Sequence, residues 1–536
     1  MALSTRAISL PDLFLITFVL IFCILFANRV YARHFHPLAR IPGPFFGRMS
    51  PWPSALHAWR GDRHLWLEEC FKKYGNKIRV APNTVIFRSP TAFQDIYSSR
   101  ANVRRADFYN ALKRTDEETS TITTIDNTLH AKRRRLLDLV FTGNSLREAA
   151  YFMQRHIDRW HELLIAGGGG DDWTPPTNFT DRANELVFDI LGDVCFGRSF
   201  KTMEPEDNAL KAVPRAAVKT LTVLNAIAKT PFIHLIIYLR PRGLARVFRA
   251  IRPATVVFFD EFVETSIRKR VEREQQSERF GEPRRDMFHF VYHARDSETG
   301  EPAFRGDQLV AECRLLLVAG SDSTSVTMTG LFFYLSHYPE ALDKLRAEIT
   351  GKFLLAEDIH PGPGLTSCKY LRAAIDEAMR MSPAGLCELQ RQVLPGGIMI
   401  DGDYFPENTV VGTAAWCDAY NDEVYGDAAI YRPERWLSED AERIKANFHP
   451  FGIGPHNCAG TNFALQELLL MVAKTVHRFE FRLSPEWAKG AGMRHRRRVG
   501  DKHVPHFHLR DAYITVRDGP VLQFRKRLSA GTAPHQ

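Results

Sequence analysis

An uncharged apolar run near the N-terminus is the strongest constraint on how this chain can fold. Residues 13–27 (LFLITFVLIFCILFA) carry no charge, and Arg29, Arg33 and Arg40 follow closely. Basic residues after an apolar helix are typical of the cytosolic side of a membrane span, whereas a cleaved signal peptide carries them before its apolar core. Because the run is shorter than the ~20 residues of an average span, adjoining residues must lengthen it. We expect a single-pass anchor over residues 10–28, with a cleaved signal and a buried helix as the alternatives.

The segment after the anchor cannot be helical throughout. Ile41-Pro42-Gly43-Pro44 combines prolines, which lack the backbone N–H donor, with a flexible glycine. We therefore expect a basic, proline-rich hinge over residues 29–44 and a folded body over residues 45–536.

The body has the composition of a globular domain, since 45% of the chain is hydrophobic and 25% is charged. Apolar spacing predicts helices over Val256–Glu274, Gln308–Ser336 and Tyr370–Met381, whereas Lys77–Phe87 and Asp511–Phe524 are typical of extended segments. No internal repeat is visible. The sequence therefore predicts one large domain that is mainly α with small β-sheets.

Charge and cysteine content narrow the class further. The chain has 71 basic and 62 acidic side chains and a formal charge of +9, which favours acidic proteins or anionic lipid as partners. No base-reading motif accompanies the basic runs at 132–135 and 496–498, so we expect no nucleic-acid partner. The eight cysteines are scattered, without a CxxC pair or the dense spacing of a secreted disulfide protein. A reduced, cytosol-facing body fits these features best.

The chemistry is concentrated at residues 451–460 (FGIGPHNCAG). A lone cysteine is more often a small core residue, but here glycines lie four residues before and two residues after Cys458. Such glycines let the backbone fold tightly over a flat ligand. An apolar helix is expected to start near Thr461, so the sulfur would lie at a helix N-terminus, where the dipole favours thiolate. The sequence predicts a metal-ligating thiolate at Cys458.

This segment resembles the haem-binding loop FxxGx[RH]xCxG of the cytochrome P450 family. Further family landmarks follow in order, so the resemblance spans roughly residues 41–527. It implies the cytochrome P450 fold, with haem b as the cofactor and Cys458 as the axial iron ligand. It also implies that Phe451 packs beside the sulfur, and that Gly452 and Gly460 belong to the haem-binding loop.

Two charged segments are similar to the same family. Glu377 and Arg380 form an ExxR pair, which alone would usually be a surface ion pair worth under about 1 kcal/mol. Residues 432–436 (RPERW) resemble the family segment whose second arginine, here Arg435, joins this pair. The resemblance implies a buried network of Glu377, Arg380 and Arg435 that supports folding and assembly of the haem pocket.

Residues 319–324 (AGSDST) lie within a long apolar segment. Gly320 lowers helix propensity there and suggests that something bulky approaches the backbone. The segment is similar to the family's oxygen-binding groove, [AG]Gx[DE]T, with Asp322 as the acid and Ser323 in place of the threonine that helps to deliver protons. The resemblance implies that Asp322 acts with Ser323 or with Thr324. The alternative, above all for Thr324, is a hydroxyl that only bonds back to the preceding helical turn.

Haem carries two propionates, so its pocket needs cations. His130 and Arg134 resemble the family's WxxxR pair, with histidine in place of tryptophan. Arg391 follows the ExxR helix, and His456 occupies the family's arginine or histidine position before the cysteine. The resemblance implies that all four bind the propionates, although each alone would more often be a solvent-facing side chain.

The substrate is the least constrained feature. By resemblance, five stretches that we expect to be apolar line the pocket and its lid, namely residues 97–124, 221–238, 317–321, 384–389 and 510–522. The overall pattern is most similar to fungal secondary-metabolite enzymes. It implies hydroxylation, epoxidation, desaturation or oxidative coupling of a hydrophobic terpenoid, polyketide or alkaloid.

Electrons must come from another protein, because we find no Walker loop, dinucleotide fingerprint or flavin domain. The resemblance implies an NADPH-cytochrome P450 reductase, with cytochrome b5 as a second candidate donor. It also implies an endoplasmic reticulum membrane with the catalytic domain in the cytosol. A reductase-independent haem-thiolate isomerase or dehydratase and a non-catalytic haem-binding protein are the alternatives. Asp322 and the neighbouring hydroxyls favour the monooxygenase.

Overall fold

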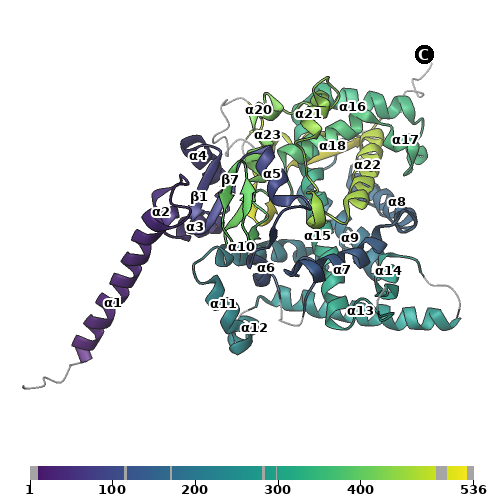
Figure 1. Cartoon of the computed structure of the whole chain (residues 1–536). Coiled ribbons are helices and arrows are strands. Elements are labelled where there is room, and N and C mark those ends of the chain that lie inside the picture. Colours follow the sequence, from purple (N-terminus) through teal and green to yellow (C-terminus); the bar gives the residue numbers. More distant parts are fainter. Residues whose placement is uncertain are drawn as a thin grey trace, which may run out of the picture.

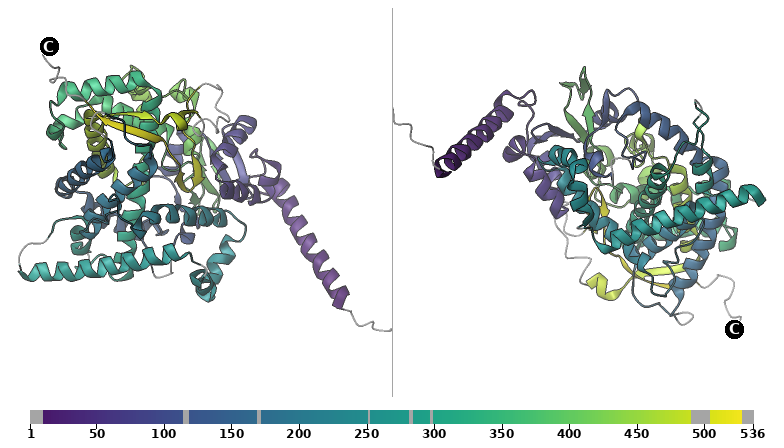
Figure 2. Two further views of the ribbon diagram at one scale, coloured as in Figure 1. Left: turned by 180° about the vertical axis from the view of Figure 1, so that it is seen from behind. Right: turned by 90° about the horizontal axis from the view of Figure 1, so that it is seen from below.

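In the computed structural model, one N-terminal helix stands apart from a helical body (Figure 1). The structure describes residues 10–113, 118–168, 172–250, 252–280, 284–296, 299–489 and 504–527, so the basic run at 496–498 lies outside the described residues. Helix α1 (Leu10–Val30) continues as a π-helical turn, η1 (Tyr31–Phe35), and projects from the body in two further views (Figure 2). Residues Phe14–Phe35 are long and apolar enough to cross a membrane, and Phe14 is 78% exposed. Helix α1 is therefore a candidate membrane anchor.

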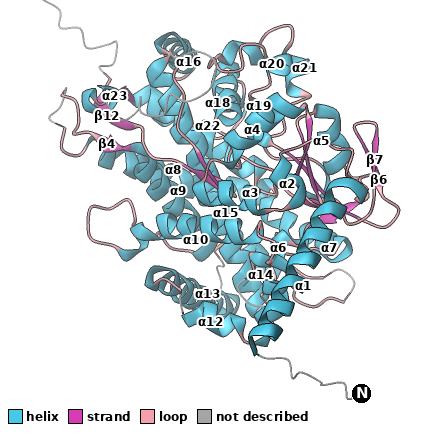
Figure 3. Ribbon diagram, turned by 90° about the vertical axis from the view of Figure 1, so that its left-hand side faces the viewer, coloured by secondary structure: helices cyan, strands magenta, loops and turns pink. Residues whose placement is uncertain are grey.

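The long helix α15 (Asp307–His337) runs through the middle of the body, and other elements pack around it (Figures 1 and 3). Its residues from Thr324 to Leu335 are all buried. It packs against α9 (Phe179–Phe196), α18 (Lys369–Met381) and α22 (Thr461–Arg478). A methyl group on Gly330 would lie 2.5 Å from Ser382 Oγ, so glycine is needed where α15 meets the end of α18.

The helices expected from apolar spacing are confirmed by α13 (Ala254–Phe280), α15 and α18, and the helix expected near Thr461 is confirmed by α22. The remaining α-helices are α2 (Phe45–Met49), α3 (Trp52–Arg60), α4 (Arg63–Tyr74), α5 (Pro90–Tyr97), α6 (Phe108–Ala111), α7 (Asn127–Asp138), α8 (Gly143–Ile165), α10 (Val213–Ala228), α11 (Ile233–Leu239), α12 (Leu244–Ala250), α14 (Met287–His293), α16 (Pro339–Lys352), α17 (Pro363–Thr366), α19 (Ala415–Ala419), α20 (Asp422–Tyr425), α21 (Ala441–Lys445) and α23 (Pro485–Lys489).

The strands form small, separate sheets, with β6 and β7 at one edge of the body and β4 and β12 at the opposite edge (Figure 3). The largest has the order β1 (Lys77–Ala81), β2 (Thr84–Phe87), β8 (Val410–Thr413), β5 (Arg391–Val393), β3 (Val103–Arg105), and only its β2–β8 pair is parallel. The smaller sheets pair β4 (Thr177–Asn178) with β12 (Val521–Lys526) and β9 (Phe479–Leu483), β6 (Ile398–Ile400) with β7 (Asp403–Phe405), and β10 (Arg510–Ala512) with β11 (Ile514–Val516). The expected fold class, mainly helical with small sheets, is confirmed.

A buried ionic network joins α18 to the short helix η6 (Pro433–Trp436). The Glu377 carboxylate accepts hydrogen bonds from Arg380 at 2.9 and 2.8 Å and from Arg435 at 2.9 Å. The Trp436 indole and the Arg432 backbone N–H each donate to it at 3.0 Å. Burial alone would raise the pKa of Glu377, but Arg380 and Arg435 hold it below its usual value. The network therefore keeps a fully buried carboxylate charged.

We predict that Glu377→Gln lowers the free energy of unfolding by about 3–5 kcal/mol, because it leaves two buried guanidinium groups without their shared anion. Urea unfolding followed by circular dichroism measures the loss. The control is Glu442→Gln, which removes an exposed carboxylate paired with Lys445 and should cost under about 1 kcal/mol. A loss for Glu377→Gln no larger than that of the control would contradict the prediction.

Candidate active site

The loop that carries Cys458 is fixed by its own main chain. The Cys458 N–H donates to the Phe451 carbonyl at 2.8 Å. Gly452 and Gly454 have φ values of 69° and 67°, a backbone conformation that side chains disfavour. A methyl group on Gly454 would lie 2.2 Å from the carbonyl oxygen of Tyr97, the last residue of α5. The position of the sulfur is therefore set by backbone geometry and by close packing on α5.

Cys458 lies deep in the protein, yet its side chain is accessible, so it lines a recess. The helix α22 begins three residues later, at Thr461. Burial nevertheless raises the pKa of the Cys458 thiol, and this effect exceeds the opposing effects of the Gly460 N–H, Arg134 and the Thr461 hydroxyl. The helix N-terminus alone therefore does not produce the expected thiolate, and a bound metal ion would have to displace the proton.

Two arginines face each other across the sheet beside this recess. Arg105 on β3 is the direct register partner of Arg391 on β5, and both are buried. Arg105 donates to the carbonyls of Thr121 and Thr124, and Arg391 donates to the Tyr109 hydroxyl and to the carbonyls of Leu389 and Gln390. Within the described residues, neither arginine has a carboxylate partner. Like charges directly opposite in a sheet are unfavourable, so the pair is suited to binding an anion.

His130 and His456 complete this cluster. Their rings are 4.2 Å apart, and His456 Nδ1 and His130 Nε2 share a hydrogen bond of 3.3 Å. Burial and the nearby arginines lower the pKa of His130 to about 3 and that of His456 to about 2. Both imidazoles are therefore neutral at pH 7, and the positive charge of the cluster comes from arginines.

Arg134 links the helix α7 to the cysteine loop. Its guanidinium donates to the Asn457 carbonyl and forms an ion pair of 2.7 Å with Asp138. The four expected propionate ligands, His130, Arg134, Arg391 and His456, thus lie together, and the structure adds Arg105 to them. The expected haem fits this donor set, because a dianionic edge would meet the three arginines while the iron met Cys458.

One face of α15 is partly accessible around Ala319. Ala319 is exposed and Ser323, four residues later, is half-buried, and the Ser323 hydroxyl donates to the Ala319 carbonyl at 2.8 Å. Thr324 is buried, and its hydroxyl lies close enough to Glu467 of α22 to lower the pKa of that carboxyl slightly against the larger effect of burial. The bulky group next to Gly320 is Leu191 of α9, which would lie 2.9 Å from a methyl group at that position. The two candidate hydroxyls therefore lie in different surroundings.

Asp322 forms an ion pair with Arg517, which follows β11. The Arg517 guanidinium donates to Asp322 Oδ1 at 2.7 Å and also binds Asn184 and Ser325. Asp322 Oδ2 is buried and has no hydrogen-bond partner among the described residues. The C-terminal segment thus holds the acid in place through one oxygen and leaves the other available.

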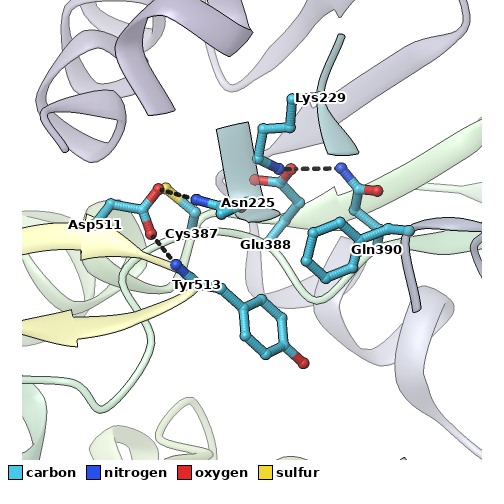
Figure 4. Close-up of a pocket in the computed structure, with 8 residues that line it drawn as sticks. Asn225, Lys229, Cys387, Glu388, Gln390, Asp511 and Tyr513 are labelled. Carbon is cyan, nitrogen blue, oxygen red and sulfur yellow. Dashed lines mark hydrogen bonds and ion pairs between the residues drawn. The ribbon is translucent and has the colours of Figure 1, made fainter. Parts of the chain in front are cut away.

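A charged cluster lies where four of the five expected substrate-lining stretches meet (Figure 4). The fully buried Glu388 pairs with Arg63 and with Lys229, the latter at 3.0 Å. Asn225 and the Tyr513 N–H donate to the buried Asp511 at 3.4 and 3.3 Å. Burial raises the pKa of Asp511, whereas Arg63 and Lys229 lower that of Glu388. We expected these stretches to be apolar. The structure shows that they also carry buried charged side chains, so that expectation is wrong in part.

Several site residues escape the sequence motifs. Arg105 lies in the RRADFY segment, but only strand register shows that it faces Arg391. Glu467 is recognisable in retrospect as a single carboxylate within the apolar run LQELLLM. Arg517 has no local signal, because its partner lies on a distant helix.

We predict that Glu467→Gln removes part of the pH dependence of stability. Burial raises the pKa of Glu467 to about 8, so between the ordinary glutamate pKa and this value the folded chain holds a proton that the unfolded chain releases. The wild type should therefore lose stability as the pH rises through this window, and glutamine cannot titrate. The urea midpoint should fall between about pH 6 and about pH 9, and this fall should be larger for the wild type than for the variant. The exposed-site control, Glu439→Gln, should behave as the wild type does, and an equal fall in all three proteins would rule out a buried neutral Glu467.

Comparison with known proteins agrees with this geometry. The family model described as Cytochrome P450 matches residues 40–492. The cytochrome P450 monooxygenase fscF of Fusarium equiseti is 32% identical, with 96% of each chain covered. The cytochrome P450 monooxygenase poxM of Penicillium oxalicum is 31% identical, covering 94% of this chain and 93% of its own, and AKT7 of Alternaria alternata is 30% identical, covering 93% and 94%. The chain therefore belongs to the cytochrome P450 family and is related to its fungal monooxygenases.

Proposed function

We propose that this protein is a haem-thiolate monooxygenase that oxidises a hydrophobic small molecule, using O2 and electrons passed from NADPH by a separate reductase. The observation that carries the proposal is the accessible Cys458 thiol on a loop whose His456 lies among Arg105, Arg134 and Arg391. A metal ligand, an anion site and a proton-handling pair on separate elements are what such chemistry requires.

Haem b is the proposed cofactor, with Cys458 as its axial ligand. Arg105, Arg134 and Arg391 would bind the propionates. The neutral His130 and His456 share one hydrogen bond, so one of the two would offer its remaining N–H. Gly452, Gly460 and Phe451 would form the loop around the ligand, and Glu377, Arg380 and Arg435 would hold the neighbouring segment in place. When bound, haem supplies the activation of oxygen, and the thiolate ligand favours O–O cleavage.

We assign proton handling to Asp322 and Ser323. Asp322 Oδ2 has no partner among the described residues, so this oxygen can take up a proton while Oδ1 stays with Arg517. The Ser323 hydroxyl lies on the accessible face of α15 and can pass a proton by turning away from the Ala319 carbonyl. Thr324 lies away from that face, beside Glu467, and we assign it a supporting role.

Apolar side chains next to Asp322 suit an apolar substrate. Side chains of α9, α10, α13 and α15 meet there around a small cavity, together with Asn184, Ser321 and Ile514. The relatives are fungal enzymes, which supports a role in secondary metabolism with a terpenoid, polyketide or alkaloid as substrate. Hydroxylation, epoxidation, desaturation and oxidative coupling are all within reach of this chemistry.

We further propose an endoplasmic reticulum anchor over residues 10–28, a hinge over 29–44 and a cytosolic catalytic domain over 45–536. Exposed aromatic residues near the anchor support contact with a membrane surface: Phe46 is 69% and Trp59 58% exposed, and Trp52 packs edge-to-face on Phe232 of the α10–α11 connection. The +9 charge suits docking of an acidic NADPH-cytochrome P450 reductase or cytochrome b5.

The carbon monoxide difference spectrum of dithionite-reduced protein tests the ligand. We expect a strongly red-shifted Soret band in the wild type and its loss in Cys458→Ala, since only thiolate ligation gives that shift. The control Cys23→Ala changes an exposed cysteine of α1 and should keep the band. An unshifted band, or a shifted band that survives Cys458→Ala, would refute the proposal. If NADPH reduced the haem without an added reductase, the proposal of a separate reductase would be refuted.

Arg105 gives a prediction that needs no substrate. Arg105→Gln should speed haem transfer to apomyoglobin about 10-fold or more, because a charge-assisted hydrogen bond to a buried anion is lost. The matched control is Arg104→Gln, whose arginine points instead to Gln392 and Asp107. Equal transfer rates for both variants would remove Arg105 from the propionate site.

A further inference from the structure

A second cluster of metal-binding side chain types lies between α13 and α14, on elements that carry none of the residues assigned to haem binding or proton handling. Glu274 comes from α13, and His289 and His293 come from successive turns of α14. Glu274 is fully buried, whereas the two histidine side chains are 17% and 29% exposed. The cluster is therefore anchored from within the protein and open to solvent on its histidine side.

The three side chains converge on one point. Their ligand atoms all lie within 4.8 Å of one another. Glu274 Oε1 contacts His289 Nδ1 and lies 3.2 Å from His293 Nε2, and the two imidazole rings are 4.4 Å apart. In a tetrahedral zinc site with bonds of about 2.0–2.1 Å, ligand atoms are roughly 3.3 Å apart. Only small side-chain movements would be needed to admit an ion.

The chemistry of the donor set points to zinc. Two histidines four residues apart on one helix face present their nitrogens to the same ion, and a carboxylate from a neighbouring helix adds a third ligand. Imidazole with carboxylate suits zinc among the divalent metals, with water in the fourth position.

The neighbouring arginine Arg270 contacts the Glu274 oxygen that faces away from the two histidines. Arg270 binds Glu274 through Oε2 and pairs with Asp286 at 3.0 Å, and Asp286 also pairs with Arg284 at 2.9 Å. The arginines are thus matched by carboxylates without the histidines. A simple ion pair would place one histidine next to Glu274 Oε1. Two imidazole nitrogens lie next to this oxygen, which is the arrangement of a metal site.

We propose that Glu274, His289 and His293 bind one Zn²⁺ ion that clamps α13 to α14. The ion binds apart from the haem site, so it contributes to the stability of the helical body and leaves the haem spectrum unchanged.

The test uses tag-free, full-length, haem-loaded protein in detergent, stripped with EDTA and titrated with ZnCl2 by calorimetry. Zinc retained after gel filtration is measured by mass spectrometry, and thermal unfolding is followed with and without zinc. The variants are His289→Gln and His293→Gln, because glutamine can still donate a hydrogen bond to Glu274. The control is His360→Gln, at an exposed histidine bound to Gln154.

We expect one retained zinc per wild-type or control molecule, binding about 10- to 100-fold weaker in either variant, and a rise in Tm with zinc only in the wild type and control. No stoichiometric zinc in the wild type, or equal binding by the variants, would overturn the proposal. A zinc-dependent change in the Soret band would assign the ion to the haem site and would also overturn it.

Discussion

The catalytic body depends on the ionic network around the Glu377 carboxylate. This carboxylate is fully buried, and two arginines, an indole and a backbone N–H compensate its desolvation. Such a network is strongly destabilised when one partner is removed. The network ties α18 to η6, and Trp436 of η6 packs on Phe448, which precedes the cysteine loop. The Glu377 network thus helps to hold the chain that leads to Cys458.

The anion site depends on an unfavourable arrangement. Arg105 and Arg391 face each other in the register of β3 and β5, and the described residues give neither of them a carboxylate. Burial, together with the field of these arginines, keeps His130 and His456 neutral at pH 7. The positive charge of the cluster therefore comes from arginines, and an anion placed there would relieve the repulsion between the strands.

Ionic contacts also tie distant segments of the body together. Arg517 holds the C-terminal segment to α15 through Asp322, and Glu388 joins Lys229, at the end of α10, to Arg63 of α4. In contrast, α11 has no buried residue. Few buried contacts mean a low cost of local opening, so α11 should open more easily than the buried helices of the body.

The sequence by itself determined the fold class, the cysteine loop and the ExxR pair, because these depend on local spacing that a single segment carries. Residues 451–460 and the helix from Thr461 are of this kind. Only the tertiary structure decided that Arg105 faces Arg391, that Arg517 holds Asp322, and that Glu467 lies beside Thr324. The physical reason is that strand register and helix packing join residues far apart in the chain. Burial, likewise, raises the pKa of the Cys458 thiol against the local effect of its helix N-terminus.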